Sequence, residues 1–388
     1  MVIDGIIGGL VKRYFNDCEE EVLANPILFG DYLQSDPTDE EKEDPRLYED
    51  LKGWAEVRTK MERMLEDYGF DNKPMNLVLF NDALDHVTKI HRILRFPRGC
   101  GLLVGYGGSG KQSLTKLATF VSGSKTWTIN LVRNYRESDF RLDLQSLFKE
   151  VVLVPKTFLF TDAHVVEEGF LELINNLLTI GMVPGLFPEE EKEGLIGPLD
   201  KEMRAKKLPE TKEFRWSYFI NRCRENLHII MAMSPAGDTL RLRCRNFPGL
   251  VSNTSIDWFF PWPEDALSDV ATYFLQKVQI DEELRKPVTS HVVMIHQSVQ
   301  KYSIEFDAVY KRKNYSTPKN YLDFIQNYMK FLADKRKICD FQVRRLEGGL
   351  ATLKNASEVC QELSEELAIK NAIIADKKVV VEAIIVDI

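Results

Sequence analysis

The stretch GLLVGYGGSGKQSLTKLA (residues 101–118) decides the fold. Its apolar start predicts a buried strand over 101–105, a glycine-rich turn follows, and SLTKLATFV (113–121) predicts a helix. The turn matches the pattern G-x-x-x-x-G-K from Gly105 to Lys111, directly after a strand and before a helix. This context is typical of a phosphate-binding loop, and it disfavours the alternative of a glycine-rich turn with an incidental lysine.

In such a loop, backbone N–H groups turn toward the phosphates, and the lysine pairs with the β- and γ-phosphates. The predicted nucleotide-binding residues are Gly105, Gly107, Gly108, Ser109, Gly110, Lys111, Gln112 and Ser113. The pattern departs at Gln112, where a Ser or Thr hydroxyl normally holds Mg²⁺. Because Ser113 lies about 100° further round the helix, it does not replace that hydroxyl. Gln112 offers only an amide oxygen, so an indirect Mg²⁺ contact is expected there.

A second buried strand is expected over KTFLFTD (156–162), and it ends in Asp162. This carboxylate suits the Walker-B position in the Mg²⁺ shell. The following residue is Ala163, where hydrolysing enzymes place the Glu that activates water, so fast hydrolysis is disfavoured against a site that holds nucleotide. The nearest other proton acceptors are His164, Glu167 and Glu168, and the two glutamates are equally explained as acids in the first turn of a helix.

A third strand is expected over NLHIIMAMS (226–234), and it ends in Ser234, a candidate contact for the γ-phosphate or the attacking water. Arginines follow on an expected helix before Phe247. Of these, Arg243 and Arg245 are candidates to reach the nucleotide of a neighbouring module in trans. For each, a solvent-facing arginine is the alternative.

Composition narrows the class of protein. The 388 residues carry 51 Lys and Arg against 59 Asp and Glu, a net charge of −8, which argues against a nucleic-acid binder. No run of 18 apolar residues predicts a membrane span, and the opening MVIDGIIGGLVKRYF has the reverse charge order of a signal peptide. The six cysteines form no CxxC pair, so a zinc site or disulfide scaffold is not expected, and a reducing compartment fits.

The alternation of strands and helices predicts an α/β fold with a parallel sheet and flanking helices. Apolar residues from Phe80 to Leu94 recur at helical spacing, and Pro97 ends that helix. Further expectations are a strand at 127–131, helices at 140–152 and 165–181, a Pro/Gly-rich insertion at 182–198, and a solvated acidic loop at 36–50.

Four segments are expected along the chain: a connection over 1–72, a large α/β subdomain over 73–263, a small helical subdomain over 264–335, and a coiled-coil helix over 336–388. From Leu332, alternating steps of four and three residues meet apolar side chains at nine of fourteen positions, without Pro. A single amphipathic helix packed on the body is the alternative. An antiparallel partner strand would lie downstream, so we expect a part of a longer polypeptide.

Several long blocks together resemble the dynein heavy chain, at the fourth AAA+ module of its motor ring. They are MNLVLFNDALDHVTKIHRILRFPRG (75–99), LLVGYGGSGKQSLTKLA (102–118), FLFTDAHVVEEGFLELINNLL (158–178) and FPGLVSNTSIDWFFPWPEDAL (247–267). The heptad tail resembles the outgoing helix of the stalk, the coiled coil that carries the microtubule-binding domain. The resemblance covers roughly residues 75–370, and the first 70 residues fit only loosely.

The resemblance implies a six-module ring that drives minus-end movement on microtubules, with the main ATPase in a first module outside this chain. It implies an auxiliary site for ATP or ADP here, with Mg²⁺ as a candidate cofactor. Implied partners are the neighbouring AAA+ modules, the microtubule through the stalk tip, and dynein intermediate and light chains, with no nucleic acid or membrane. Gln112 and Ala163 resemble axonemal forms, which implies the cytoskeleton of a ciliary or flagellar axoneme.

The resemblance also implies that Leu77, Val78 and Leu79 flank the adenine, although core packing explains them as well. Lys319 falls where the family has its second sensor, in place of an Arg. The leading hypothesis is a regulatory nucleotide site coupled to the stalk root, with weak or no hydrolysis of its own. A purely structural module with a non-cycling nucleotide is the alternative. An independent P-loop ATPase or kinase is disfavoured by Gln112 and Ala163.

Overall fold

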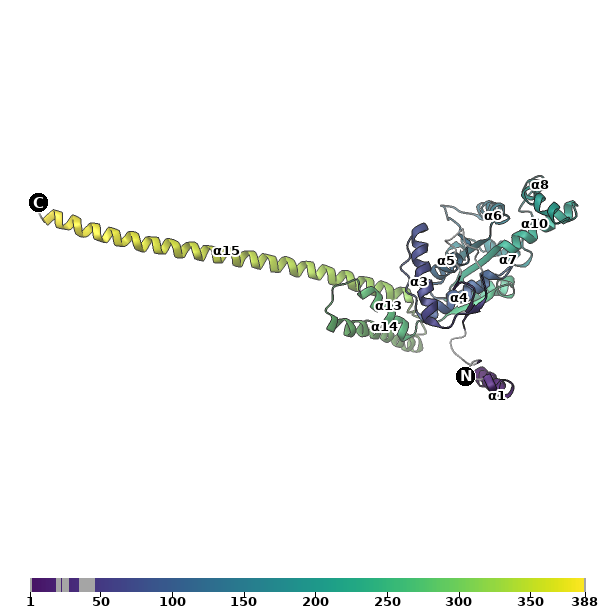
Figure 1. The fold of residues 1–388 in the computed structure, drawn as a ribbon, viewed down its shortest axis with the longest axis horizontal. Coiled ribbons are helices and arrows are strands. Elements are labelled where there is room, and N and C mark those ends of the chain that lie inside the picture. The colour runs from purple at the N-terminus through teal and green to yellow at the C-terminus, as the bar shows by residue number, and fades with distance from the viewer. Residues whose placement is uncertain (1, 19–21, 23–27, 35–45, 387–388) are drawn as a thin grey trace. The chain divides into compact units, whose positions relative to one another are not determined.

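A computed structural model of the chain describes residues 2–18, 22, 28–34 and 46–386 (Figure 1). The chain divides into two compact units, Met1–Leu322 and Asp323–Ile388. The first unit holds the sheet and the candidate site, and the second consists of the greater part of one long helix.

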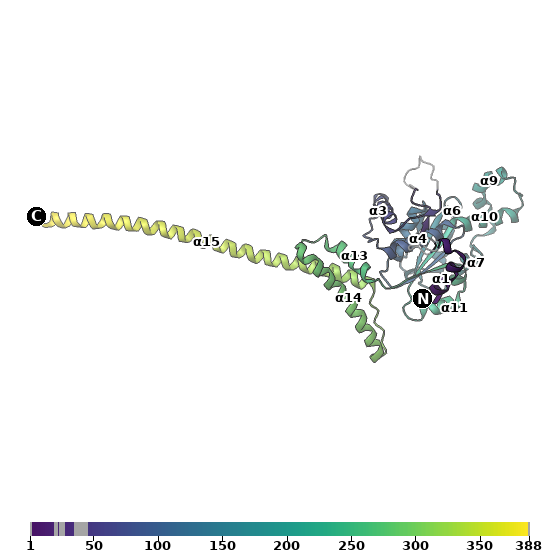
Figure 2. The same ribbon diagram turned by 60° about the horizontal axis from the view of Figure 1, so that its bottom comes forward.

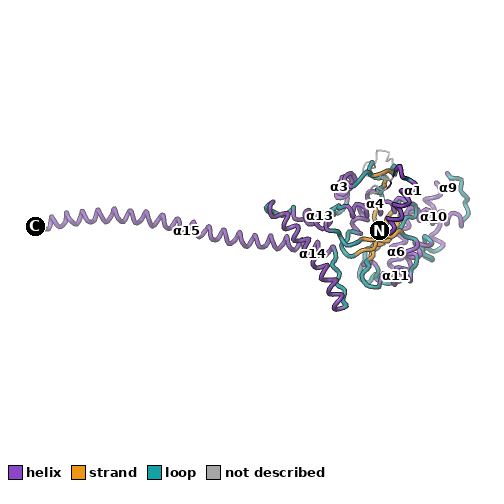
Figure 3. The backbone as a smooth tube through the Cα atoms, turned by 90° about the horizontal axis from the view of Figure 1, so that it is seen from below, coloured by secondary structure: helices purple, strands orange, loops and turns teal. Residues whose placement is uncertain are grey.

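A five-stranded parallel sheet forms the centre of the first unit, which confirms the expected α/β class. Its strands are β3 (Gly101–Gly105), β4 (Lys125–Trp127), β5 (Lys156–Thr161), β6 (Leu227–Met233) and β7 (Ser255–Phe259), in the order β4-β5-β6-β3-β7. The strands, orange in Figure 3, lie among helices. β3 and β6 are buried along their whole length, as expected for central strands covered on both faces.

Helices connect successive strands as crossovers, which parallel pairing requires. The longer ones are α5 (Lys111–Val121), α6 (Glu137–Val151), α7 (Gly169–Thr179) and α10 (Lys212–Asn226), while α4 (Asn81–Arg95) precedes β3. Shorter elements are η2 (Asp162–His164), α8 (Glu189–Ile196), η3 (Gly197–Leu199), α9 (Asp200–Ala205), α11 (Thr239–Asn246) and α12 (Gly249–Ser252). Rings of Phe140, Phe158, Phe160 and Phe170 are fully buried and contact one another in the core beside β5.

The expected helices and strands are confirmed with four differences. The strand predicted at 127–131 is wrong beyond Trp127, because β4 pairs with β5 over only three residues and Ile129 is then buried from a loop. The helix predicted from 165 begins at Gly169, since the 3-10 turn η2 follows β5. The insertion at 182–198 contains the helix α8, and strand β7 was not predicted.

The N-terminal part comprises α1 (Val2–Tyr14), η1 (Asn16–Cys18), β1 (Phe29–Gly30), β2 (Glu49–Asp50) and α3 (Trp54–Asp71). Most of the predicted acidic loop, residues 36–45, lies outside the described residues.

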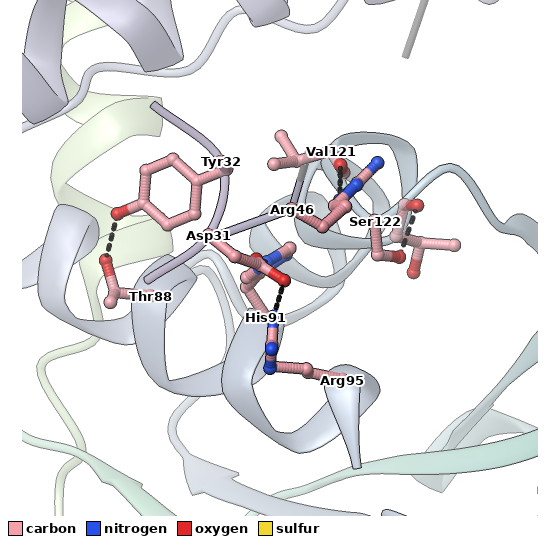
Figure 4. A network of polar contacts seen from close by, with 9 residues as sticks. Asp31, Tyr32, Arg46, Thr88, His91, Arg95, Val121 and Ser122 are labelled. Carbon is pink, nitrogen blue, oxygen red and sulfur yellow. Dashed lines mark hydrogen bonds and ion pairs between the residues drawn. The ribbon is translucent and has the colours of Figure 1, made fainter. Parts of the chain in front are cut away.

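A network of polar contacts joins residues 31–32 and Arg46 to α4 and α5 (Figure 4). Asp31 accepts from His91 at 2.5 Å and from Arg95, and the Tyr32 hydroxyl lies 2.8 Å from the Thr88 hydroxyl. Arg46 donates to the carbonyl of Val121 at 3.1 Å, the last residue of α5. The connection preceding the sheet therefore contacts both α4 and the helix that follows the glycine-rich loop.

Past residue 263 the described chain is helical, as expected. It forms α13 (Glu264–Leu275), α14 (Glu282–Tyr310) and α15 (Pro318–Val386), and α13 packs beside α14 (Figure 2). α15 is continuous through 335 and 336, so the expected boundary there falls inside one helix. Leu346, Leu350 and Leu353 are exposed along α15, while coiled-coil pairing stays a prediction. None of the described helices is long and apolar enough to cross a membrane.

Candidate nucleotide-binding site

The sheet order brings the predicted site residues to one edge. β6 lies between β5 and β3, and all three strands run parallel. Their carboxyl ends therefore meet at the same edge, where β3 leads into the glycine-rich loop, β5 into Asp162 and β6 into Ser234. Ligands of open α/β sheets bind at the carboxyl ends of the strands.

The loop from Gly105 to Lys111 has the backbone shape that its glycines permit. Gly108 has φ +84° and Gly110 has φ +92°, both in the left-handed region that favours glycine. Gly110 directly precedes α5, so the loop turns its chain at the N-terminus of that helix. The positive end of the helix dipole and the free N–H groups of the first turn both favour an anion there.

Lys111 is folded back onto this loop. Its ammonium donates to the carbonyl oxygens of Gly105 at 2.6 Å and Tyr106 at 2.9 Å, and to the Ser109 hydroxyl at 3.2 Å. The residue is only 8% exposed. Burial lowers the pKa of Lys111 to about 8, and the charge of Asp162 opposes part of that shift. The Lys111 ammonium thus lies beside the anion-binding loop, and its burial costs hydration free energy.

Both carboxylate oxygens of Asp162 are engaged. Oδ2 accepts from the backbone N–H of Ser234 at 2.6 Å, and Oδ1 accepts from Nη1 of Arg243 at 2.9 Å. Nε of Arg243 also donates to Glu168 at 3.2 Å. The Ser234 hydroxyl accepts from the N–H of Ala236 at 3.3 Å. Asp162, Ser234 and Arg243 therefore form one hydrogen-bonded group at the ends of β5 and β6.

The acceptors beyond Asp162 differ in their placement. Nδ1 of His164 accepts from the backbone N–H of Thr161 at 3.2 Å, and burial lowers the pKa of this histidine. Glu168 is tied to Arg243, and Ala163 has no polar side-chain atom. The structure thus gives neither His164 nor Glu168 a free position beside Asp162 for activating water.

The start of α15 approaches the loop closely. The N–H of Lys319 donates to the carbonyl of Gly107 at 3.4 Å, and the rings of Tyr106 and Tyr315 lie 5.3 Å apart. A Cβ atom added at Gly108 would lie 2.5 Å from the backbone nitrogen of Lys319. The residues expected at the second-sensor position therefore pack against the loop through their backbone.

A cavity of about 530 Å³ lies between α3, residues 75–79 and α13. Leu77 and Val78 line it together with Tyr273 of α13, and both are half-buried. Leu79 lines it as well but is itself buried. The polar wall comes from α3, with Arg58 and Glu62. The cavity has room and apolar surface for a purine, which is what the expectation for Leu77 and Val78 requires.

The remaining predicted residues are placed as follows. Gln112 is exposed on the first turn of α5, and Ser113 beside it is half-buried. Arg245 is exposed on α11, whereas Arg243 contacts its own chain, at Asp162. The ion pair between Arg243 and Asp162 was not predicted, because 81 positions separate the two residues. Their opposite charges were the one signal in the sequence that could have suggested it.

Comparison with known proteins gives one family. Residues 75–331 match the family model described as P-loop containing dynein motor region D4. The chain is 48% identical to human "Dynein axonemal heavy chain 10" over 98% of its own length and 8% of that protein. It is also 48% identical to "Dynein-1-alpha heavy chain, flagellar inner arm I1 complex" of Chlamydomonas reinhardtii, over 94% of this chain and 8% of that protein.

The chain thus spans about 8% of the length of these curated relatives. Among solved structures, it is similar to Hsp104 in the S. cerevisiae Hsp104:casein complex, at 12% identity and a TM-score of 0.40. That likeness covers 70% of this chain and 40% of the other, and it is too low to add to the fold assignment.

Proposed function

This chain belongs to the dynein heavy-chain family as the P-loop-containing motor region D4, and we propose that it binds ATP or ADP as a regulatory module of a microtubule motor. The observation that carries the proposal is the loop itself. Two left-handed glycines, a helix N-terminus and a buried lysine converge at the sheet edge that also holds Asp162. Each of these features favours a phosphate chain.

In the proposed complex, the phosphates replace the loop's own groups as partners of Lys111. The ammonium leaves the carbonyls of Gly105 and Tyr106 and meets phosphate oxygens, while backbone N–H groups of the loop donate to the same anion. The base occupies the cavity lined by Leu77 and Val78. Apolar walls suit the purine faces, and polar groups of α3 suit its edge.

The residues present fit Mg²⁺ poorly. Both oxygens of Asp162 have partners within the chain, and Gln112 supplies an exposed amide where a hydroxyl ligand is normal. No group of three His, Cys, Asp or Glu side chains suited to a metal occurs in the described ranges. Asp162 and Gln112 are the residues that would hold Mg²⁺ if it bound with the nucleotide, and it would then supply positive charge beside the phosphates.

Hydrolysis at this site is proposed to be weak or absent. Ala163 cannot accept a proton, His164 is bonded to the strand end, and Glu168 is bonded to Arg243. Glu167 is exposed in the turn before α7. General base catalysis needs an acceptor within hydrogen-bond reach of the attacking water. A nucleotide that stays bound between exchange events is the expected result.

The regulatory role is proposed from the position of α15. This helix begins beside the loop, where Lys319 contacts Gly107, and it continues unbroken to Val386. A nucleotide that shifts the loop therefore acts on the first turn of the helix that resembles the stalk root. Such coupling requires that the nucleotide states differ in their contacts with Lys319.

The wider assignments follow the named relatives. One is axonemal and one belongs to a flagellar inner arm complex, so we infer a ciliary or flagellar axoneme as the location. The inferred partners are neighbouring AAA+ modules of the same heavy chain, intermediate and light chains, and the microtubule through the stalk tip. Arg245, exposed on α11, is the better placed candidate for a trans-acting arginine, and Arg243 would first have to leave Asp162.

A purely structural module with a non-cycling nucleotide is the second candidate, favoured by the missing catalytic acceptor at Ala163. A chase experiment on the intact heavy chain separates the two. The motor is loaded with 8-azido-ATP, chased with excess ATP and irradiated at intervals, and label is counted in peptides of this chain. Loss of label within the motor's cycle time supports regulation. Label that persists for hours supports the structural role.

A further inference from the structure

The charge arrangement around Asp162 differs from that of a metal-assisted nucleotide site. One guanidinium, that of Arg243, lies between two carboxylates, with 2.9 Å to Asp162 and 3.2 Å to Glu168. Its side chain is 13% exposed, whereas those of Asp162 and Glu168 are 40% and 60% exposed. The arginine is thus the most buried member, and its position is fixed by two charge-assisted hydrogen bonds.

Arg243 is distinguished from the other arginines of α11 by this placement. Arg241 and Arg245 are exposed, and within the described part of the chain no ion pair or side-chain hydrogen bond is found for either. The contacts of Arg243 use Nη1 and Nε, so neither employs Nη2. A planar guanidinium held in this way keeps donors for a further anion, and it stays charged at every physiological pH.

A divalent cation and Arg243 would compete for the same place. Oδ1 of Asp162 is the oxygen left after the Ser234 N–H takes Oδ2, and Arg243 occupies it. A cation beside that oxygen would face the guanidinium at close range with like charge. On the first turn of α5, Gln112 lacks the hydroxyl that holds the metal in related loops.

We propose that Arg243 takes the place of the divalent cation, so that this site binds nucleoside di- or triphosphate without Mg²⁺. This inference rests on the proposed nucleotide-binding function. The guanidinium offsets one of the two negative charges of Asp162 and Glu168, and its unused Nη2 donors remain available to the phosphate chain. Arg243 is then a binding residue of its own module, in addition to any contact with a neighbour.

The test is photolabelling of the intact heavy chain with 8-azido-ADP, in excess Mg²⁺ and in EDTA, with label counted only in peptides of this chain. For the unaltered chain, the half-saturating concentration should change less than about threefold on removal of Mg²⁺. For Arg243→Gln it should rise about tenfold or more in EDTA, the loss expected for a charge-assisted hydrogen bond to the ligand.

Two further variants control the result. Arg241→Gln removes an exposed arginine of the same helix and should leave both half-saturating concentrations unchanged. Arg243→Lys keeps the charge and should retain most of the binding in EDTA, which distinguishes a charge effect from local misfolding. Lys111→Ala shows how much of the photolabel depends on nucleotide binding at the glycine-rich loop.

The outcomes separate the two proposals. If label depends on Lys111 but falls tenfold or more in EDTA for the unaltered chain, the site needs its metal and the role of Arg243 is refuted. The same holds if Arg243→Gln binds like the unaltered chain in EDTA. If no label depends on Lys111 under either condition, nucleotide binding at this site is refuted, and this inference with it.

Discussion

Nucleotide affinity at this site should fall as pH rises through about 8, because the binding cation is Lys111. Burial lowers the pKa of this lysine from 10.5 to about 8, and only its protonated form can pair with phosphates. Full affinity is therefore expected below pH 8, with a loss above it. A group with a pKa near 8 is about three-quarters protonated at pH 7.5 and about one-tenth protonated at pH 9.

The predicted loss of affinity is thus about eightfold between pH 7.5 and pH 9, if binding follows the protonated fraction. Phosphate groups complete their second ionisation near pH 6, so the ligand's charge is constant over this range. The assay is photolabelling of the intact heavy chain by 8-azido-ADP at each pH, with label mapped to residues 1–388.

Lys111→Arg is the matched control for this titration. A guanidinium keeps its charge at pH 9, so this variant should bind more weakly overall but with no pH dependence in the range. Affinity of the unaltered chain that stays constant to pH 9 would refute the assignment of Lys111 as the titrating cation. A pH dependence of equal size in Lys111→Arg would refute it as well.

Three substitutions test the packing that supports the site, each read by hydrogen exchange of local peptides in the intact heavy chain. Gly108→Ala should expose peptides around Lys319, since a non-glycine residue at positive φ costs about 1–2 kcal/mol and its Cβ would lie 2.5 Å from that backbone; unchanged exchange there contradicts the close approach. Tyr32→Phe should lower the local stability of α4 by about 1 kcal/mol, because its hydroxyl bonds Thr88 in a buried setting, and no change would mean that this bond is not formed. Leu144→Ala should destabilise the sheet core by about 2–5 kcal/mol, because the side chain is fully buried, whereas a cost below about 0.5 kcal/mol would place Leu144 outside the core.

The glycine-rich loop and its flanking elements were predictable from local sequence. The apolar run before Gly105, the Lys at 111 and the helix after it are consecutive, so periodicity and motif spacing locate them together. The same holds for Asp162, which ends a run of buried apolar residues. Parallel pairing then implies that the carboxyl ends of these strands meet.

Strand β7 could not be predicted in this way. Its central residue Asp257 is buried, which local pattern does not predict. In the fold, its carboxylate lies 2.7 Å from His86 Nδ1 and 3.9 Å from Lys89 Nζ, both of α4. Asp257 and His86 are 171 positions apart, so no window of sequence contains the pair. The contact between Arg243 and Asp162 escaped prediction for the same physical reason: long-range ion pairs depend on the folded topology.

The extent of β4 shows a different limit. Residues 127–131 have the composition of a strand, but composition alone does not set where an edge strand ends, since β5 continues to Thr161, beyond the last residue that pairs with β4. β5 pairs with β4 only over Lys125–Trp127, and the chain then leaves the sheet. Ile129 is buried, but from a loop, so apolar character alone predicted its secondary structure wrongly.

The central claim is that Lys111 and its loop hold the phosphates of a bound nucleotide. A cryo-EM structure of the intact heavy chain with saturating ADP tests it most directly. We predict density for ADP or ATP at the loop, with the Lys111 ammonium within hydrogen-bond distance of phosphate oxygens and released from the carbonyls of Gly105 and Tyr106. An empty loop under saturating nucleotide, with Lys111 still bonded to those carbonyls, would contradict the account.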